Sequence, residues 1–435
     1  MSVKKQTAPK QRLVVVGNGM IGTRTVEEAL KRAPGRYDIT VFGAEPHPNY
    51  NRILLSSVLA GEKTLEDIVS HPLAWYAERG VTLVAGDPVE AIDPAAKTVT
   101  SAAGRIAPYD RLVLATGSKP LAPPLPGLNL PGVCTFRDIA DLGTMTDSAR
   151  RHKRTVVIGG GLLGLEAAWG LQRRGMAVSV IHLMRTLMER QLDEAAGLML
   201  QRDLARRGLS FFTNSQTEEI FGAERVEGVR LADGREIPAD LVVLAIGVRP
   251  NIDLARQAGL EVNRGIVVDD AMRTSDENIA AVGECAEHRG QVYGLVAPLW
   301  KHAEACAAGL AGEPATPYVA PSLFTSLKIT GVDVFSAGAL AAVDEADDEI
   351  TLNDPRGGAY KKLVLRAGKL VGAVLYGDVA DGPWFVELIR EGRDIEPIRV
   401  RLMFGRPYAE AHEAPAPKAA GASGRSAETL VEKAA

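Results

Sequence analysis

The 435-residue sequence is poor in cysteine, in aromatic residues and in long apolar runs. Its three cysteines, Cys134, Cys285 and Cys306, form no CxxC or CxxxxC pair, which excludes a local redox disulfide and a four-cysteine iron–sulfur site. We expect three small, mostly buried thiols. No apolar run approaches the roughly 20 residues that a membrane helix needs, so we expect no membrane partner.

Two further absences narrow the class of protein. The formal net charge of −4 lacks the basic excess that a nucleic-acid partner needs. The first residues are polar and lead directly into a predicted strand, without the apolar segment of a signal peptide, so we expect a cytoplasmic location. No His-rich or Cys-rich cluster indicates a metal site, and no GxSxG motif occurs.

Two glycine-rich fingerprints are the most informative features that are present. The first, Gly17-Asn18-Gly19-Met20-Ile21-Gly22, follows the apolar run 13–16, and the second, Gly159-Gly160-Gly161-Leu162-Leu163-Gly164, follows the run 155–158. Each pattern predicts a strand, a tight turn and a helix start, where backbone N–H groups and the helix dipole bind a pyrophosphate. Two such sites predict a tightly held dinucleotide and a diffusing one, an arrangement that moves electrons.

The surrounding sequence predicts an α/β fold with two doubly wound, Rossmann-like domains. The first unit reads strand 12–16, helix 23–33 and strand 38–42, and the second reads strand 154–158, helix 165–174 and strand 177–181. The segments 110–117 and 240–247 resemble each other, and each follows a turn signal, Ala103-Gly104 or Asp233-Gly234. We therefore expect each unit to end with a hairpin and a buried strand that stops at glycine.

The length predicts two or three domains. A stiff, proline-rich linker at 118–127 and the segment 248–251 predict two domain crossings. We expect a split first domain of residues 1–117 and 248–318, with a second nucleotide domain, 118–247, inserted into it. Apolar strands at 361–365 and 369–376 predict a small α+β domain over 319–405. Residues 406–435 predict a disordered tail.

Several polar residues are candidates for dinucleotide contacts. Glu45 follows the second predicted strand, where an acid binds ribose hydroxyls, although a solvated loop carboxylate is the alternative. In the second unit the corresponding residue is His182, with Arg185 nearby. An acid there would favour the 2′-hydroxyl of NADH, and a basic residue the 2′-phosphate of NADPH. These residues leave the choice of coenzyme open.

Three other candidates have both a functional and a purely structural interpretation. Glu166 is close to the start of the second predicted helix, where its charge is favourable without any function, and the alternative is a contact with nicotinamide. Gly283-Glu284 follows a predicted strand and either approaches a cofactor or forms a plain strand-to-helix turn. Arg52 can pair with a pyrophosphate, and the alternative is an isolated arginine without a function.

The sequence resembles the FAD-dependent flavoprotein reductases of the pyridine nucleotide–disulfide oxidoreductase superfamily. The motifs that carry the resemblance occur in the family's order: Gly17-x-Gly19-x-x-Gly22, Ala115-Thr116-Gly117, Gly159-x-Gly161-x-x-Gly164 and Val282-Gly283-Glu284. Within the superfamily the chain is similar to the N-terminal flavin portion of the assimilatory NAD(P)H nitrite reductase large subunit and to the nitrate reductase electron-transfer subunit. The segments 42–56, 182–193 and 328–336 carry this closer likeness, and the resemblance covers residues 12–405.

The resemblance implies FAD as cofactor and NADH or NADPH as substrate. It implies that FAD lies on the first fingerprint, with Glu45 at the adenosine ribose and Val89 near the adenine. Arg52, Thr116 and Gly117 would lie along the cofactor. It further implies that Gly283 and Glu284 hold the ribityl–pyrophosphate region and that Ala297 and Pro298 approach the flavin ring. The second fingerprint, with Gly247 at the end of its domain, would take NAD(P)H, and Glu166 would lie close to the nicotinamide.

The sequence also departs from the family. No cysteine occurs in the first helix or in the loop that follows the Tyr50 region, the two places where disulfide reductases carry one, and Ser57 stands where ferredoxin reductases carry a lysine. The 435 residues hold no cysteine-rich iron–sulfur and sirohaem region. We therefore expect an oxidoreductase that passes electrons from NAD(P)H through FAD to a separate redox protein, either ferredoxin-like or a nitrate or nitrite reductase catalytic subunit. The alternatives are a ferredoxin, rubredoxin, quinone or oxygen reductase, and a non-catalytic FAD/NADH redox sensor.

Overall fold

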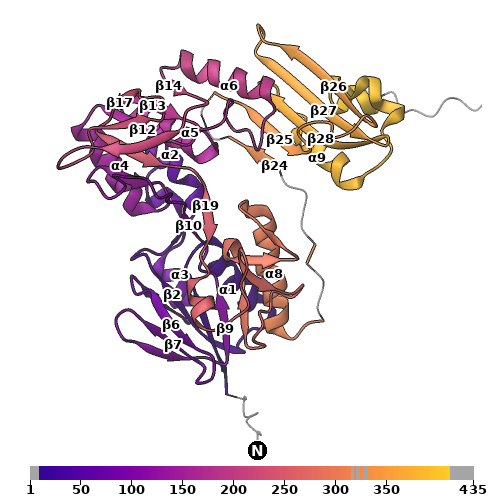
Figure 1. The fold of residues 1–435 in the computed structure, drawn as a ribbon. Coiled ribbons are helices and arrows are strands. Elements are labelled where there is room, and N and C mark those ends of the chain that lie inside the picture. Colours follow the sequence, from indigo (N-terminus) through magenta and orange to yellow (C-terminus); the bar gives the residue numbers. More distant parts are fainter. Residues whose placement is uncertain (1–8, 315–317, 320–323, 328, 330, 412–435) are drawn as a thin grey trace, which may run out of the picture.

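The computed structural model describes residues 9–314, 318–319, 324–327, 329 and 331–411. Within them, three five-stranded sheets form the centres of the fold, two of them parallel and the third antiparallel. The first parallel sheet lies in the lower half of Figure 1, and the other two sheets lie side by side in the upper half. Among the described residues, no helix is long and apolar enough to cross a membrane.

The first parallel sheet carries the first fingerprint. Most of its strands are apolar and largely buried, as expected for a sheet covered on both faces, whereas in the edge strand 81–85 only Val81 is buried. α1 (Met20–Arg32) and α8 (Val296–Ala311) pack against each other beside it. The strand order is β21 (Ile279–Ala281), β9 (Arg111–Leu114), β1 (Gln11–Val16), β2 (Tyr37–Gly43) and β5 (Val81–Ala85).

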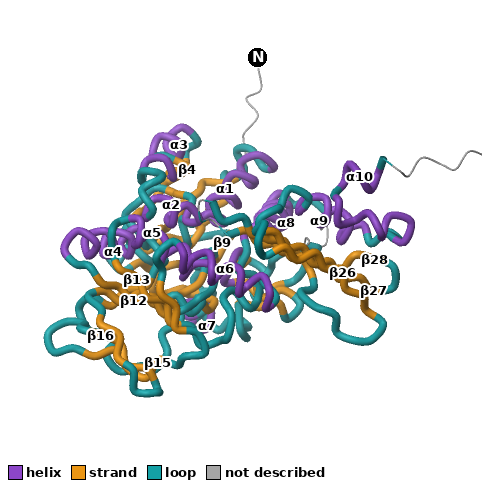
Figure 2. The backbone as a smooth tube through the Cα atoms, turned by 90° about the horizontal axis from the view of Figure 1, so that it is seen from above, coloured by secondary structure: helices purple, strands orange, loops and turns teal. Residues whose placement is uncertain are grey.

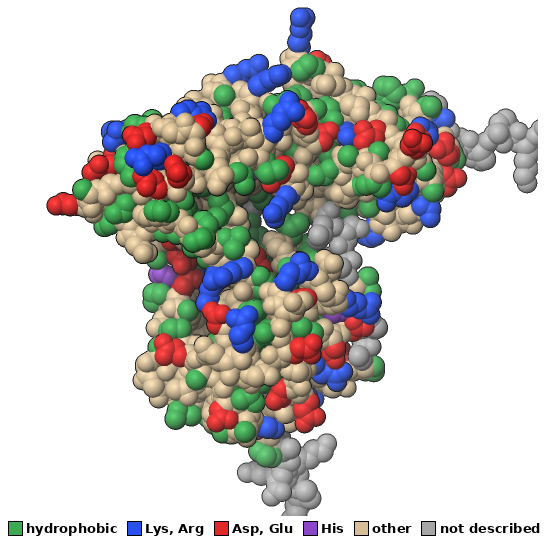
Figure 3. Space-filling view, in the orientation of Figure 1, with side chains coloured by type: hydrophobic (Ala, Val, Ile, Leu, Met, Phe, Trp, Pro, Cys, Tyr) green, Lys and Arg blue, Asp and Glu red, His purple; other side chains and the backbone are tan. Residues whose placement is uncertain are grey.

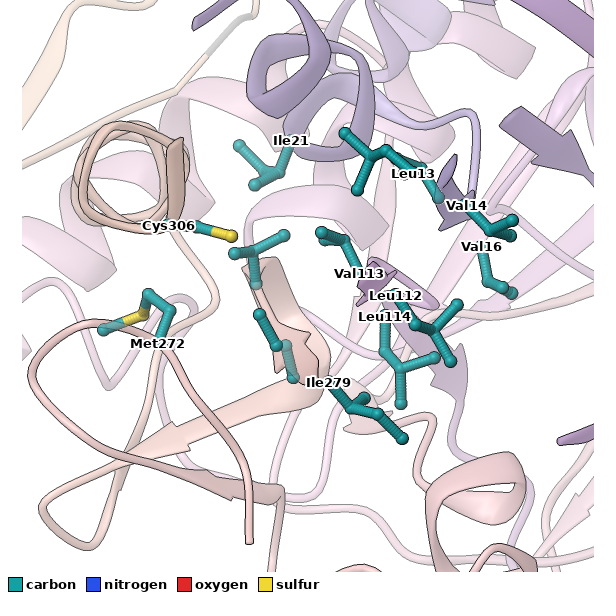
Figure 4. Close-up of a cluster of buried hydrophobic side chains, with 14 of the residues drawn as sticks. Leu13, Val14, Val16, Ile21, Leu112, Val113, Leu114, Met272, Ile279 and Cys306 are labelled. Carbon is teal, nitrogen blue, oxygen red and sulfur yellow. The ribbon is translucent and has the colours of Figure 1, made fainter. Parts of the chain in front are cut away.

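Figure 4 shows the core of this sheet, where side chains of β1, β9 and β21 meet Cys306 of α8 and Met272. The remaining elements of this half are short. They are β3 (Asn49–Tyr50), β4 (Val69–His71), α3 (Leu73–Glu78), α7 (Asp253–Gln257), β20 (Ile266–Val268), β22 (Ala286–His288), β23 (Gln291–Val292), and 3-10 turns at 52–54, 66–68 and 283–285.

The second parallel sheet repeats this arrangement around the second fingerprint. In Figure 2, α2, α4 and α5 lie on one side of β12 and β13, and β15 and β16 lie on the other. The strand order is β11 (Val133–Thr135), β18 (Leu241–Leu244), β12 (Arg154–Ile158), β13 (Ala177–Ile181) and β14 (Ser210–Phe212). The helices are α4 (Ile139–Arg151), α5 (Leu162–Arg173) and α6 (Glu194–Arg206).

Each unit also contains the expected hairpin before its last buried strand. Each hairpin belongs to a three-stranded antiparallel sheet. The first of these sheets comprises β6 (Val89–Asp93), β7 (Thr98–Ser101) and β8 (Ile106–Pro108), and the second comprises β15 (Thr217–Phe221), β16 (Gly228–Leu231) and β17 (Glu236–Pro238).

An antiparallel strand pair lies at the two predicted crossings between the halves. β10 (Ser118–Pro120) pairs with β19 (Val248–Pro250), so the two predicted crossings lie side by side. On the face seen in Figure 3, the surface is hollowed between the upper and lower parts, at the level of this pair. The pairing supports a split first domain, whose residue boundaries stay a prediction.

One segment of the predicted first domain packs on the second unit. α2 (Leu55–Leu59) contacts α5, where a Cβ on Gly170 would lie 2.7 Å from Cγ of Leu59. Arg174 donates from Nε to the carbonyl of Leu59 (2.5 Å) and from Nη2 to that of Val58 (2.9 Å). The small Gly170 thus allows the two helices to approach closely.

The third sheet is antiparallel, and the expected strand 369–376 is one of its members. Its order is β24 (Phe324–Ser326), β25 (Val334–Gly338), β28 (Lys369–Tyr376), β27 (Ala359–Arg366) and β26 (Asp347–Asp354). α9 (Gly382–Glu391) and a 3-10 segment, Glu396–Phe404, cover it. It meets α6 of the second unit, where the hydroxyl of Tyr376 donates to Asp203 (3.1 Å).

Two expectations about element bounds were wrong. The disordered tail cannot begin at residue 406, because α10 (Arg406–Glu410) is helical and Ala409 is buried in the third core. Residues 412–435 of that expected tail lie outside the described residues. α1 and α5 begin at Met20 and Leu162, three residues earlier than predicted, because each helix starts directly after the middle glycine of its GxGxxG pattern, Gly19 or Gly161.

Candidate functional site

The first glycine-rich loop connects β1 to α1, and its three glycines have different surroundings. Gly17 has φ +122°, and a Cβ there would lie 2.1 Å from the carbonyl oxygen of Ala115. A Cβ on Gly22 would lie 2.1 Å from the carbonyl oxygen of Gly17. A Cβ on Gly19 would meet nothing within 4 Å. Only the middle glycine therefore faces open space, where a pyrophosphate can approach the backbone.

The second loop repeats this pattern between β12 and α5. Gly159 has φ +123°, and a Cβ there would lie 2.3 Å from the carbonyl oxygen of Ala245. A Cβ on Gly164 would lie 2.0 Å from the carbonyl oxygen of Gly159, whereas one on Gly161 would meet nothing within 4 Å. Two cradles of the same construction are thus present, one at each parallel sheet.

The helix that follows each loop offers backbone donors to an anion. Neither Gly19 nor Gly161 has a side chain that caps its helix, and the first turns contain no acidic residue. The N–H groups and the positive end of the helix dipole therefore suit a phosphate, so both loops fit the dinucleotides that the sequence predicts. The first turns hold the residues expected there: Met20 and Ile21 in α1, and Leu162 and Leu163 in α5.

Asn18 uses its side chain to fix the first loop. Its Oδ1 accepts from the hydroxyl groups of Tyr76 (2.7 Å) and Thr23 (3.3 Å), and its Nδ2 donates to the carbonyl of His47 (3.3 Å). Asn49 Nδ2 donates to the carbonyl of Asn18 (3.0 Å). These hydrogen bonds use the side-chain amide of Asn18 and its backbone carbonyl, so the residue makes the loop more rigid.

Glu45 and Arg52, the two candidates after β2, form an ion pair. Oε1 of Glu45 lies 2.7 Å from Nη2 of Arg52, and Oε2 accepts from the hydroxyl of Tyr50 at 2.7 Å. Burial raises the pKa of Tyr50, so the phenol stays a donor to this carboxylate. Arg52 also donates from Nη1 to the carbonyl of Arg137 (2.8 Å).

Arg137 brings the second unit into the first site. Its Nη2 lies 2.5 Å from Oε2 of Glu284, which also accepts from the hydroxyl of Ser118 (2.7 Å). The Nε of Arg137 is buried without a hydrogen-bond partner, and a Cβ on Gly117 would lie 3.9 Å from Nη2. An unpaired buried donor is unusual and marks a place where an acceptor is expected.

The Gly283 turn closes the site from a third side. Gly283 has φ +85°, and a Cβ there would lie 3.4 Å from Cβ of Ile21 in the first turn of α1. Thr116, two residues after β9, donates its hydroxyl to the carbonyl of Asn251 (2.7 Å). Cys285, the residue after Glu284, is buried, and burial raises the pKa of its thiol. The structure thus brings the first fingerprint together with the Gly283 turn.

Three residues expected near the flavin or the adenine lie at element starts. Val89 is buried at the first position of β6. Ala297 and Pro298 lie in the first turn of α8, which has no side-chain cap and packs against α1. Their proximity to a cofactor stays a prediction, as do the roles of the other candidate residues.

At the second cradle, Glu166 and Gly247 have defined surroundings. Glu166 is only 5% exposed on α5. Gly247 has φ +113°, and its carbonyl accepts from the N–H of Leu121 (2.9 Å), which ties the end of the second unit to the linker.

His182 directly follows β13 and contacts the second loop. Its Nδ1 accepts from the N–H of Gly160 (3.1 Å), and a Cβ on Gly160 would lie 2.8 Å from its Cγ. Its Nε2 meets Oε2 of Glu189 at 3.0 Å. Arg185, the basic candidate nearby, is 75% exposed and pairs with Glu194 (2.9 Å).

Sequence reasoning missed Arg137 and Glu189. Arg137 is an isolated arginine between β11 and α4, and no motif marks it. Glu189 lies seven residues after His182 in a loop, whereas the rule for ribose-binding acids concerns the end of the strand itself. Arg137 is found only through its contact with Glu284, which is distant in the sequence, and Glu189 only through its contact with the side chain of His182.

Two parallel sheets, each with a glycine cradle, define a class of protein that binds two dinucleotides. The family model described as pyridine nucleotide-disulphide oxidoreductase matches residues 11–307, and that of the rubredoxin NAD+ reductase C-terminal domain matches residues 324–393. The chain belongs to the pyridine nucleotide-disulphide oxidoreductase family. Membership makes it an oxidoreductase with FAD as cofactor and NADH or NADPH as substrate.

Individual relatives share this architecture. The chain is 51% identical over 386 residues to the NAD(P)H nitrite reductase of Bacillus subtilis strain 168, covering 89% of this chain and 48% of the relative. It is 47% identical to the assimilatory nitrate reductase electron transfer subunit of the same organism, covering 89% and 50%. The structure of a covalent putidaredoxin reductase–putidaredoxin complex superposes with a TM-score of 0.80 at 26% identity, covering 90% of this chain and 95% of that one.

The chain spans about half the length of the curated relatives it matches, 48% and 50%. The activities in those relatives' names belong to longer proteins. The comparisons establish the family and the fold of this chain. They do not assign its electron acceptor.

Proposed function

We propose that the protein takes electrons from NAD(P)H through FAD and passes them to a separate redox protein in nitrate or nitrite assimilation. The observation that carries the proposal is the pair of glycine cradles, each open only at its middle glycine. The identities of 51% and 47% to the two Bacillus subtilis proteins support the metabolic context. The expected acceptor is ferredoxin-like or a catalytic subunit of nitrate or nitrite reductase.

The first cradle would hold FAD. Gly17–Gly22 would present backbone N–H groups to its pyrophosphate, and Glu45 would accept from its adenosine ribose. Arg52 and Arg137 both lie next to carboxylates there, at Glu45 and Glu284, and each can offer guanidinium donors to a phosphate. The remaining contacts are those implied by the family: Val89, Ala115, Thr116, Gly117, Gly283, Glu284, Ala297 and Pro298.

The second cradle would hold NAD(P)H at Gly159–Gly164. The chemistry that FAD supplies when bound is acceptance of a hydride from NAD(P)H and release of its two electrons to an acceptor. The protein's part is to hold the two dinucleotides with their reactive ends together, and the β10–β19 pair sets the orientation of the two cradles. Glu166, buried on α5, would orient the nicotinamide.

The test is anaerobic reduction followed by an acceptor screen. The purified protein should be yellow, with about one extractable FAD per chain, and NADH or NADPH should bleach the flavin. The reduced protein should then transfer electrons to a ferredoxin or to a nitrate or nitrite reductase catalytic subunit. A folded protein that cannot be reconstituted with FAD would refute the proposal, and bleaching without turnover on any protein acceptor would favour a redox sensor.

A ferredoxin or rubredoxin reductase is the second candidate. Residues 324–393 match the C-terminal domain model of rubredoxin NAD+ reductases, which favours a small iron protein as acceptor. Both candidates allow a ferredoxin as acceptor, so rubredoxin is the acceptor that distinguishes the second from the first. Faster reduction of rubredoxin than of the nitrate or nitrite reductase subunits, at equal concentrations, would decide for the second.

A further inference from the structure

A carboxylate lies beside the carboxyl end of β13, although the residue that follows this strand is a histidine. A backbone N–H can only donate, so Nδ1 of His182 must accept from Gly160, and the ring proton of the neutral imidazole is on Nε2. Nε2 therefore donates to Oε2 of Glu189 at 3.0 Å. His182 thus holds a carboxylate from the following loop next to the second cradle.

The loop that carries Glu189 is fixed against the same glycine. Met188 has φ +53°, and its N–H donates to the carbonyl of Gly160 at 3.0 Å. Leu187 and Met188 are fully buried, whereas the side chain of Glu189 is 29% exposed. The backbone is therefore anchored while the carboxylate stays open to solvent.

The carboxylate keeps acceptor capacity for a ligand. Oε1 of Glu189 lies 4.0 Å from Nε of Arg190, which is longer than a hydrogen bond. Each carboxylate oxygen has two lone pairs, and His182 uses only one at Oε2. Two vicinal hydroxyl groups can therefore donate to this carboxylate.

We propose that Glu189 binds the adenosine ribose hydroxyls of the pyridine nucleotide and thereby selects NADH over NADPH, with His182 as its positioning residue. The inference rests on the proposed function, in which the second cradle takes NAD(P)H. An acid at the end of the second strand of a nucleotide-binding βαβ unit serves this purpose, and here the loop delivers it. A 2′-phosphate would face the negative charge of Glu189 and be repelled.

Arg185 and Arg190, the basic residues on either side of Glu189 in the loop, do not form a phosphate site. Arg185 pairs with Glu194 at 2.9 Å, and the side chain of Arg190 is 87% exposed and lies 4.0 Å from Glu189. Tight phosphate binding needs several donors that converge on one point. Here the two guanidinium groups are 75% and 87% exposed and lie beside different carboxylates, so they do not converge on one point.

The experiment measures the binding of ADP-ribose and of 2′-phospho-ADP-ribose to the FAD-loaded protein by calorimetry. The natural sequence should bind ADP-ribose at least tenfold more tightly. In Glu189→Gln, which keeps the size and removes the charge, this ratio should fall about tenfold. Glu224→Gln makes the same charge change at an exposed residue between β15 and β16 and should keep the natural ratio.

Glu189→Asp provides a second variant, since it keeps the charge and shortens the reach, and its ratio should be intermediate. Anaerobic flavin reduction should show the same order of preference for NADH over NADPH. A natural preference for the 2′-phosphate, or an unchanged ratio in Glu189→Gln, would overturn the inference and leave the proposed function intact. If neither ligand binds and neither coenzyme reduces the flavin, the proposed function fails, and the inference with it.

Discussion

Arg137 and Glu284 form an ion pair with an N···O distance of 2.5 Å, although 147 positions separate them in the sequence. Arg137 lies between β11 and α4 of the second unit, and Glu284 follows β21 of the first sheet. Both side chains are 20% exposed. The pair therefore fixes the second unit directly beside the Gly283 turn, where the first cradle and the linker meet.

We expect Arg137→Met to weaken FAD binding ten- to a hundredfold. The substitution removes charge-assisted donors from the first cradle, and a hydrogen bond to a charged group contributes about 1.5–3 kcal/mol. Titration of the apoprotein with FAD, followed by fluorescence, measures the change. Arg150→Met removes an exposed charge from α4 and should leave FAD affinity as it was. If both variants bind FAD with the same affinity, Arg137 is only a structural partner of Glu284 and does not contact FAD.

A valine at one of the two middle glycines should impair one dinucleotide site and leave the other intact. Gly19 and Gly161 have extended backbones (φ −77° and −81°) that any residue adopts, and a Cβ meets open space at both. Both variants should therefore fold. Gly161→Val should keep its FAD and lose reduction by NAD(P)H, because the added side chain blocks the pyrophosphate, and Gly19→Val should lose FAD. Comparable loss of both functions in Gly161→Val would refute the two-site assignment.

We expect the free energy of unfolding to decrease from neutral pH to mild acid because of His302. It is fully buried in α8, and neither ring nitrogen has a hydrogen-bond partner among the described residues. The rings of Tyr293 and Tyr318 pack edge-on against it, with centroids at 5.7 and 4.7 Å. Burial, with a smaller effect of His288, lowers the pKa of His302 to about 4.

The sign follows from proton uptake on unfolding. Between the folded pKa of about 4 and the unfolded value near 6.5, the unfolded chain binds more protons at residue 302. The contribution of this residue to stability is complete above pH 6.5 and decreases towards pH 4, by on the order of 3 kcal/mol. Denaturant unfolding of His302→Leu at pH 7.5 and pH 5 should show a smaller loss than the natural protein. A parallel loss in both proteins would contradict the assignment.

Local patterns predicted the elements that carry the cradles. The strands 154–158 and 177–181 lie where the sequence places them, because buried β-branched runs next to glycine turns have few alternatives. The packing of α2 on the second unit was not predictable. It depends on the fit of Leu59 to Gly170, and these residues become neighbours only in the folded chain.

In the candidate sites, too, local sequence patterns predicted some residues, and others are found only from contacts in the folded chain. Glu45 was found because it follows its strand, and the structure places it in an ion pair with Arg52. At the second cradle the same rule led to His182, whereas the carboxylate belongs to Glu189 in the loop beyond. A rule based on position in the sequence cannot detect an acid that reaches the site through the hydrogen bond of another side chain.

We expect turnover to be independent of cysteine. Burial raises the pKa of the thiols of Cys134 and Cys306 to about 12 and also raises that of Cys285, so all three remain protonated at neutral pH. The thiolate is the reactive form, and all three cysteines are free, so no thiol relay is expected between flavin and acceptor. The triple Cys→Ala variant should keep its rate of flavin reduction and of artificial one-electron acceptor turnover within about twofold, roughly 0.4 kcal/mol of barrier.

The triple Cys→Ala variant should nevertheless be less stable than the natural protein. A loss of stability without a loss of turnover would show that the cysteines contribute to packing and not to electron transfer. Cys285 and Cys306 are buried in the first core, and removing a buried sulfur costs about 1 kcal/mol at each position. Urea unfolding of the single variants measures this cost, and Cys134→Ala, at a half-buried position, should lose less. If flavin reduction survives in the triple variant while acceptor turnover falls about a hundredfold, equivalent to roughly 2.7 kcal/mol of barrier, a thiol carries the electrons and direct transfer from the flavin is wrong.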